Sequence, residues 1–183
     1  MYTHSATTIA LLCFICFPGN SCDAATAEPS ADEYKVKGAF LLNFAKFIEW
    51  PAATFRAPTD PISICIFGKS PFGAEFDRAA KSLDISGHKI AIQDDVAFAA
   101  LSACQIVFVS SAERKRIRPL FERLKGMSVL TVGEIDGFLN NGGVINFGLD
   151  GGKIRIEINA EAAEQANLRI SAKLLSLGQA RRK

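Results

Sequence analysis

The fold of this chain is constrained most by three short and mostly apolar runs, residues 62–67, 105–109 and 128–132. Segments in which apolar residues recur at helical spacing lie between them. Strands without alternating polar residues are typical of a parallel sheet that is buried on both faces, and strands that alternate with helices are joined by right-handed crossovers. The sequence therefore predicts a three-layer α/β fold around a mostly parallel, doubly wound sheet of the flavodoxin or Rossmann kind.

The helical periodicity and the turn residues place the other elements. A first helix is expected over residues 34–50, because its large apolar residues recur at helical spacing and Pro51 ends it. Further helices or helical turns are predicted over residues 71–83, 94–103, 112–125, 135–139 and 160–177, and a further strand over residues 88–93.

Near the carboxyl end, residues 143–147 and 153–159 have the pattern of two strands. The segment between them, Gly148-Leu149-Asp150-Gly151-Gly152, is typical of a hairpin turn, so we expect an antiparallel pair that closes one edge of the sheet. In the second strand isoleucines alternate with polar residues, which predicts one polar face. Arg155 and Glu157 lie on that face and are candidate ligand-binding residues.

The first 27 residues have the features of an export signal. Residues 9–17 form an apolar run that is far shorter than the roughly 20 residues needed to cross a bilayer. Pro18-Gly19 follows it, and Ala25-Thr26-Ala27 is a small-x-small cleavage pattern, although Lys and Arg are absent from the preceding segment. We expect cleavage after Ala27, a single domain over residues 28–183, and a periplasmic location. A buried strand or helix at the amino terminus is the alternative.

Five cysteines are present, of which Cys13, Cys16 and Cys22 lie in the expected signal segment. Cys65 and Cys104 remain, an even number in an oxidising compartment, so one disulfide is predicted between them. In the usual doubly wound order the first and third strands are neighbours, which brings these cysteines to adjacent strands. For the bond to form, the fold must accommodate an offset of about 10 Å between the two cysteines along the strand direction. Two buried free thiols are the alternative.

Charge and residue composition exclude several functions. Lys and Arg total 21 against 19 Asp and Glu, a formal charge of +2, so no excess of positive charge favours nucleic acid. Gly68-Lys69-Ser70 lacks the glycine five positions earlier that a phosphate-binding loop requires. The chain has two histidines, and neither they nor the acidic residues form a recognisable catalytic or metal-binding pattern. We therefore expect a protein that is not an enzyme and that binds no metal or cofactor.

A binding site is still expected where the parallel strands end. In doubly wound sheets, ligands lie beyond the carboxyl ends of the strands, here the loops at residues 68–73 and 110–114. Lys69, Ser70, Phe72 and Ser111 are candidate ligand-binding residues at this edge. Turn formation and helix capping explain the same residues equally well.

The chain also resembles a known family in several segments whose order and spacing agree. The opening segment is Tyr34-Lys35-Val36-Lys37-Gly38-Ala39-Phe40-Leu41-Leu42-Asn43-Phe44-Ala45-Lys46-Phe47-Ile48-Glu49-Trp50-Pro51. The others are Ile64-Cys65-Ile66-Phe67-Gly68, Ile106-Val107-Phe108-Val109-Ser110, Ser128-Val129-Leu130-Thr131-Val132-Gly133, Gly143-Val144-Ile145-Asn146-Phe147 and Arg155-Ile156-Glu157-Ile158-Asn159. Together they resemble the YfiR-like family of exported proteins over nearly all of the mature chain.

The resemblance implies a periplasmic regulator that inhibits a YfiN-like inner-membrane diguanylate cyclase by binding its periplasmic portion. It implies relief of that inhibition by a YfiB-like outer-membrane lipoprotein and by oxidative or envelope stress. A second cysteine pair known in the family has Leu139 and Asn146 at the aligned positions here, so redox control through a second bridge is not expected. An exported small-ligand-binding or enzymatic flavodoxin-like domain is the alternative function.

The first predicted helix is also the expected partner surface. Its large apolar side chains are more than one face of a surface helix needs, so part of the apolar area is expected to remain for a partner. These residues are Phe40, Leu41, Phe44, Phe47 and Trp50. A helix that is buried on most sides, or a homodimer through the same surface, are the alternatives.

Overall fold

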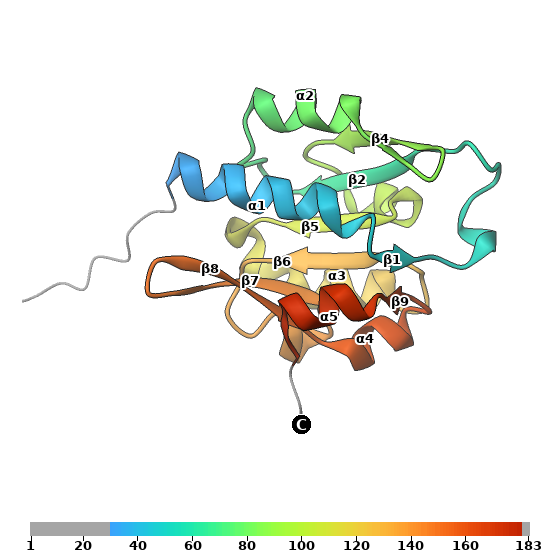
Figure 1. Cartoon of the computed structure of the whole chain (residues 1–183). Coiled ribbons are helices and arrows are strands. Elements are labelled where there is room, and N and C mark those ends of the chain that lie inside the picture. Colours follow the sequence, from blue (N-terminus) through green and yellow to red (C-terminus); the bar gives the residue numbers. More distant parts are fainter. Residues whose placement is uncertain (1–29, 181–183) are drawn as a thin grey trace, which may run out of the picture.

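The computed structural model describes residues 30–180, and the expected signal segment lies outside these residues (Figure 1). The main sheet has the strand order β10-β8-β7-β6-β5-β2-β4-β3. Parallel pairs join β4, β2, β5, β6 and β7 in turn, whereas β3 pairs with β4, and β7 with β8, antiparallel. The prediction of a mixed α/β fold with a mostly parallel sheet is confirmed. The strands are β2 (Ile62–Phe67), β3 (Asp84–Ile85), β4 (His88–Gln93), β5 (Ile106–Val109), β6 (Leu130–Gly133), β7 (Ile145–Asp150), β8 (Lys153–Ile158) and β10 (Gln179–Ala180).

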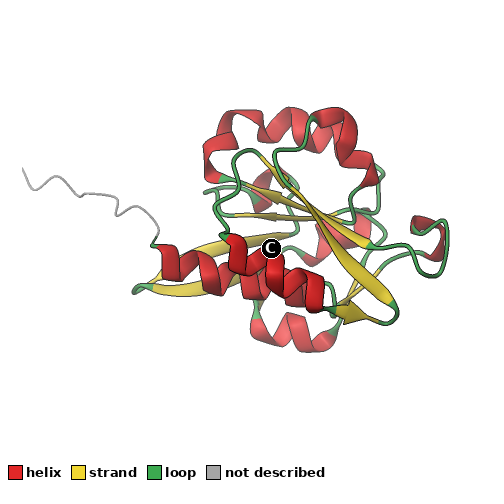
Figure 2. Ribbon diagram, turned by 90° about the horizontal axis from the view of Figure 1, so that it is seen from above, coloured by secondary structure: helices red, strands yellow, loops and turns green. Residues whose placement is uncertain are grey.

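Helices cover both faces of this sheet, as Figure 2 shows from above. One face packs against α1 (Ala31–Phe44), α2 (Ala74–Ser82), α4 (Ala160–Gln165) and α5 (Ala172–Leu177), and the other packs against α3 (Ile117–Leu124). The remaining helical turns are η1 (Ala52–Thr54), η2 (Phe98–Ala103), η3 (Ser111–Arg116) and η4 (Leu139–Asn141).

The central strands are buried on both faces because their residues alternate between two apolar cores. In β5, Ile106 and Phe108 join the core beneath α1, while Val107 and Val109 join the core beneath α3. Side chains of successive strand residues point to opposite faces, so a strand with a core on each side needs apolar residues throughout. The continuous apolar runs in the sequence follow from this arrangement.

The expected helix over residues 34–50 is wrong in its second half. The helix α1 begins after Ser30, whose side chain accepts a hydrogen bond from the Glu33 N–H, and it ends at Phe44. The following residues form the short strand β1 (Ile48–Glu49), which pairs antiparallel with β9 (Arg169–Ile170). Pairing with a segment distant in sequence outweighs the local helical periodicity here.

The expected helix over residues 160–177 is also interrupted. Asn167 has φ of 55°, a left-handed conformation that asparagine tolerates, and β9 follows before α5 begins. The β7–β8 pair does not close the edge of the sheet as expected, because β10 pairs parallel with β8 on its outer side. The helix predicted over residues 112–125 starts as the 3₁₀ helix η3 and becomes α-helical at Ile117.

The other predicted helices have shifted or altered ends. Of residues 71–83, the helix α2 includes Ala74–Ser82, preceded by an extended Gly73. Of residues 94–103, a 3₁₀ helix forms over Phe98–Ala103 alone. The turn predicted at residues 135–139 is present, since the Phe138 N–H donates to the Ile135 carbonyl at 3.0 Å, and the 3₁₀ helix η4 follows it from Leu139. Helix ends are weakly specified by local sequence, because capping and tertiary packing decide them.

Candidate functional site

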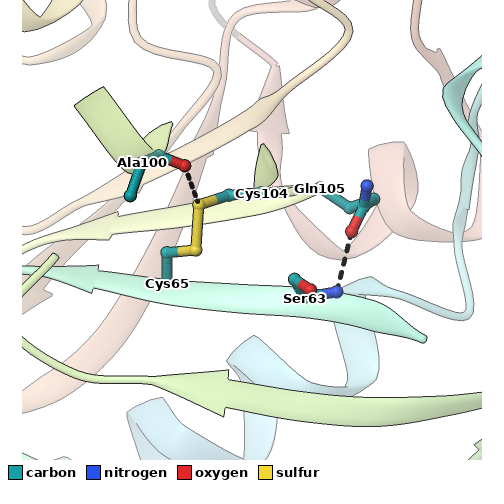
Figure 3. The surroundings of a disulfide bond; sticks show 5 residues. All are labelled: Ser63, Cys65, Ala100, Cys104 and Gln105. Carbon is teal, nitrogen blue, oxygen red and sulfur yellow. Dashed lines mark hydrogen bonds between the residues drawn. A yellow bond between two sulfur atoms is a disulfide. The ribbon is translucent and has the colours of Figure 1, made fainter. Parts of the chain in front are cut away.

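The disulfide between Cys65 and Cys104 is present, with the two Cα atoms 5.9 Å apart (Figure 3). The expected offset between the two cysteines along the strands does not prevent the bond, because Cys104 is not in line with β5. It caps the 3₁₀ helix η2 and lies beside Cys65 before the chain enters the strand. Gln105 then anchors the start of β5. Its N–H donates to the Ser63 carbonyl, and its side-chain oxygen accepts from the Ser63 N–H.

A buried ionic cluster lies where β6 ends and α1 passes over the edge of the sheet. Glu134 follows β6, and its carboxylate accepts hydrogen bonds from Lys37 Nζ at 2.7 Å and from the Tyr34 hydroxyl at 3.0 Å. The Ser111 N–H lies 3.4 Å from the same carboxylate, and Glu33 lies 2.6 Å from Lys37. The side chains of Lys37 and Glu134 are only 4% and 3% exposed.

This cluster fixes the first turns of α1 against the sheet. Removing one member of a buried, hydrogen-bonded ion pair leaves an uncompensated charge and typically costs about 3–5 kcal/mol. Burial, followed by the negative charge of Glu134, raises the pKa of Tyr34 well above its usual range. A tyrosine held protonated is a hydrogen-bond donor rather than a nucleophile or base, so the cluster has the character of a structural clamp.

Three of the predicted ligand-binding residues lie together beside this cluster. Ser111, Arg155 and Glu157 line a polar pocket of about 510 Å³ that also includes Glu134 and Asn146. In it, Arg155 binds Glu157 at 2.8 Å, and the Asn146 amide donates to Glu157 at 3.3 Å. Two chain segments that are distant in sequence therefore form one pocket at the carboxyl edge of the parallel strands.

The other three predicted ligand-binding residues lie elsewhere. Phe72 lines an apolar groove of about 440 Å³ between α1 and α2, and its ring packs against those of Phe76 and Phe108. Lys69 is exposed and Ser70 is half-buried, and neither lines the polar pocket. The loop after β2 thus contributes to packing at this edge more than to the pocket.

Two of the expected partner-binding residues are core residues instead. Leu41 and Phe44 are 0% and 1% exposed, because α1 lies flat across the sheet and directs these side chains into the core. Phe40, Phe47 and Trp50 are half-buried. The prediction that Leu41 and Phe44 belong to an exposed partner surface is therefore wrong for the folded monomer.

An exposed apolar surface does exist, but the β7–β8 pair supplies much of it. Only Ile145 and Asn146 of β7 pair with β6, and only Glu157 and Ile158 of β8 pair with β10. The rest of the pair, residues 147–150 and 153–156, projects beyond the sheet as a two-stranded ribbon (Figure 1). We call these residues the ribbon.

The two faces of the ribbon differ in polarity. On one face, Phe147 lies opposite Ile156, and Leu149 lies opposite Ile154, whereas Arg155 belongs to the other face. Phe147 anchors the apolar face, since its ring packs against those of Phe44 and Phe40 at 5.7 and 6.4 Å.

The apolar face of the ribbon continues onto neighbouring helices. Ile154, Phe40 and Leu177 line a shared groove, Val36 lies one helical turn before Phe40, and Leu149 lies opposite Ile154. Val36, Leu149 and Leu177 are 47%, 52% and 60% exposed. We call these five residues the apolar surface. The prediction from the sequence included only Phe40 of this set, because exposure depends on where the ribbon ends relative to β6 and β10.

Residues 30–180 contain no cluster of His, Cys, Asp and Glu side chains that could hold a metal ion. In the same part of the chain, no helix combines the length and the hydropathy required to cross a membrane.

The sequence did not predict the buried cluster at Glu134. Nothing local indicates that Lys37, nearly a hundred positions earlier, reaches Glu134.

Comparison with known proteins gives one clear family match. No curated protein matches the chain. A crystal structure of a conserved domain protein from Vibrio cholerae O1 biovar El Tor is similar, with a TM-score of 0.44 and 13% identity. That match covers 65% of this chain and 54% of the other, so the chain spans about half the length of the protein it matches. The model of the YfiR/HmsC-like family matches residues 34–179. The chain therefore belongs to the YfiR/HmsC-like family.

Proposed function

We propose that this protein is an exported regulator that binds and inhibits an inner-membrane diguanylate cyclase and so lowers cyclic-di-GMP. Membership in the YfiR/HmsC-like family suggests a periplasmic regulator of cyclic-di-GMP signalling. The disulfide between Cys65 and Cys104 supports an oxidising compartment. The inhibitory contact with the periplasmic portion of a YfiN-like cyclase, and its relief by a YfiB-like lipoprotein, are the parts of the proposal that go beyond family membership.

The apolar surface is the observation that carries this proposal. Val36 in α1, Leu149 on the ribbon and Leu177 in α5 each expose a large apolar side chain. Leu177 lines one groove together with Phe40 and Ile154. Contiguous exposed apolar area costs solubility and is typical of sites that bind another protein. Of the charged groups near it, Glu134 is engaged in the clamp and Arg155 in the pair with Glu157, whereas Lys153 is exposed. This arrangement favours binding over catalysis.

The polar pocket supports a second candidate function, the binding of a small ligand. Its volume of about 510 Å³ and its lining by Ser111, Arg155 and Glu157 suit a small polar molecule. Catalysis on such a ligand is not favoured, because Glu134 and Tyr34 are already committed to each other and to Lys37. Copurification of a small molecule with the folded protein would favour this alternative.

The proposal is tested by measuring cyclic-di-GMP in cells that lack the gene and are complemented with exported variants. The wild type is expected to lower cyclic-di-GMP. A Leu149→Asp variant is expected to fold, because this side chain is exposed, and to leave cyclic-di-GMP high. Ser102→Asp adds the same charge in η2, on the opposite side of the sheet, and should act as the wild type does. Equal cyclic-di-GMP with and without the wild-type protein would contradict the proposal.

A further inference from the structure

Within the ribbon, β8 has β7 as its neighbour on one side and no neighbouring strand among the described residues on the other. On the outer side of β8, β10 pairs with Glu157 and Ile158 alone, and within residues 30–180 no strand pairs with that side over residues 153–156. The N–H and C=O groups of a free strand edge are a template for a further strand. The chain thus presents a free edge at the place where its apolar surface is exposed.

A groove runs beside this free edge. It has a volume of about 320 Å³, and its apolar lining comes from Phe40, Ile154, Ile156 and Leu177. A strand added to β8 would direct alternate side chains to opposite faces of the ribbon. Apolar side chains at every second position would then enter the groove, and the intervening side chains would lie on the polar face.

The charges on the polar face favour acidic residues at those intervening positions. Lys153 is exposed and has no ion-pair partner in the part of the chain that the structure describes. Arg155 binds Glu157 at 2.8 Å and lies 3.8 Å from Asp150, but its Nε is buried without a hydrogen-bond partner. Opposite charges on facing residues of adjacent strands stabilise the pairing, and like charges destabilise it.

A second copy of the chain does not suit this edge. In an antiparallel pairing of β8 with itself about a two-fold axis, facing residues must lie on the same face of the sheet. In three of the possible registers Lys153 faces Lys153, Lys153 faces Arg155, or Arg155 faces Arg155 of the other copy. The register in which Ile156 faces Ile156 requires Glu157, whose outer side is already paired with β10. Each of the three registers that remain places two cations opposite each other, so the charge pattern selects a different polypeptide.

We propose that the partner adds an extended segment of alternating apolar and acidic residues to the outer edge of β8, beside Lys153–Ile156. This inference rests on the proposed function, since the partner of the regulator supplies the segment. Main-chain hydrogen bonds to β8 provide affinity, the groove beside Leu177 selects apolar side chains, and Lys153 and Arg155 select acidic ones.

Fluorescence anisotropy with labelled model peptides tests this proposal. The probe is a short peptide in which valine and glutamate alternate, and it is expected to bind the wild-type protein. Lys153→Glu with Arg155→Glu should weaken binding about tenfold, because two facing charge pairs change from attraction to repulsion. The same variant should prefer a valine–lysine peptide. Arg123→Glu with Lys125→Glu, at the end of α3, is the control with equal charge change and should bind as the wild type does.

Two further measurements separate strand addition from other modes of binding. N-methylation of alternate peptide amides should abolish binding, and hydrogen exchange of the amides at residues 153–156 should slow when the unmodified peptide is present. Equal binding of the glutamate and lysine peptides, insensitivity to N-methylation, no binding at about 1 mM peptide, or protection of these amides by self-association without peptide would each overturn the inference.

The cyclic-di-GMP assay distinguishes this inference from the proposed function. If the Lys153→Glu, Arg155→Glu variant fails to bind peptide but lowers cyclic-di-GMP as well as the wild type does, strand addition is wrong and the proposed function stands. If the wild type does not lower cyclic-di-GMP, the proposed function fails whatever the peptide result.

Discussion

Reduction of the disulfide between Cys65 and Cys104 should lower the stability of the domain substantially without changing its fold. The bond closes a loop of 39 residues. In the chain-entropy model, closing a loop of this length in the unfolded state contributes about 4 kcal/mol to the free energy of unfolding. For a urea dependence of about 2 kcal/mol per molar, the unfolding midpoint should fall by about 2 M.

The assay is urea unfolding of the wild type, followed by circular dichroism, with and without a thiol reductant. A Cys65→Ala, Cys104→Ala variant serves as a matched comparison, because both sulfurs are buried and their removal also costs packing. The variant should be less stable than the reduced wild type by about 1–2 kcal/mol, since each alanine loses a buried sulfur contact. Reduction isolates the loop-closure contribution because it leaves the side chains in place.

Two results would be incompatible with a disulfide that stabilises the domain by closing this loop. A change of less than about 1 kcal/mol on reduction would show that loop closure contributes little, which requires a compact reduced state before folding. Labelling of two free thiols in denatured, unreduced protein from the periplasm would show that the bond does not form at all. The second result would also weaken the argument for an oxidising compartment.

Three further predictions concern the clamp and α1. Glu134→Gln should lower the free energy of unfolding by about 3 kcal/mol in urea titrations, because Lys37 keeps a buried charge with less compensation; no measurable loss would contradict the clamp. The raised pKa of Tyr34 means that the folded state resists deprotonation of this side chain. The contribution of Tyr34 to the free energy of unfolding is therefore complete below the unfolded pKa of about 10 and is lost as pH rises above that value. The wild type should therefore lose more stability than Tyr34→Phe between about pH 9 and pH 11, and parallel curves would refute this. Leu41→Asp should prevent folding, whereas Val36→Asp, less than two helical turns away and exposed, should fold and lose cyclase inhibition, as circular dichroism and cyclic-di-GMP assays can show.

The sequence predicted the strands that are buried on both faces and missed the elements that depend on distant contacts. Residues 62–67 were predicted with the boundaries that the structure has, because an apolar run between turn residues is a local signal. The end of α1 at Phe44 was missed, because β1 forms only by pairing with β9. No local pattern indicates such a pairing between segments far apart in the chain.

Only part of the candidate site was predicted, because the contacts that form the rest join residues far apart in the sequence. Ser111, Arg155 and Glu157 lie at the carboxyl edge of the sheet, where doubly wound sheets bind ligands, and the structure brings them to one pocket. The clamp was missed because the partner of Glu134 is far away in the sequence. The periodicity of α1 could not show which side faces the sheet, so Leu41 was expected at a surface to which Val36 in fact contributes.

Inhibition of a membrane diguanylate cyclase through the apolar surface can be measured with purified components. The assay follows cyclic-di-GMP synthesis by such a cyclase, taken from the same genome and reconstituted in nanodiscs, while the purified regulator is titrated. The wild type is expected to lower the rate of synthesis to a plateau, whereas folded Leu149→Asp is expected to have little effect at the same concentrations. A rate that is unchanged by the wild type for every cyclase with a periplasmic portion, or equal inhibition by Leu149→Asp, would show that the apolar surface does not inhibit the enzyme.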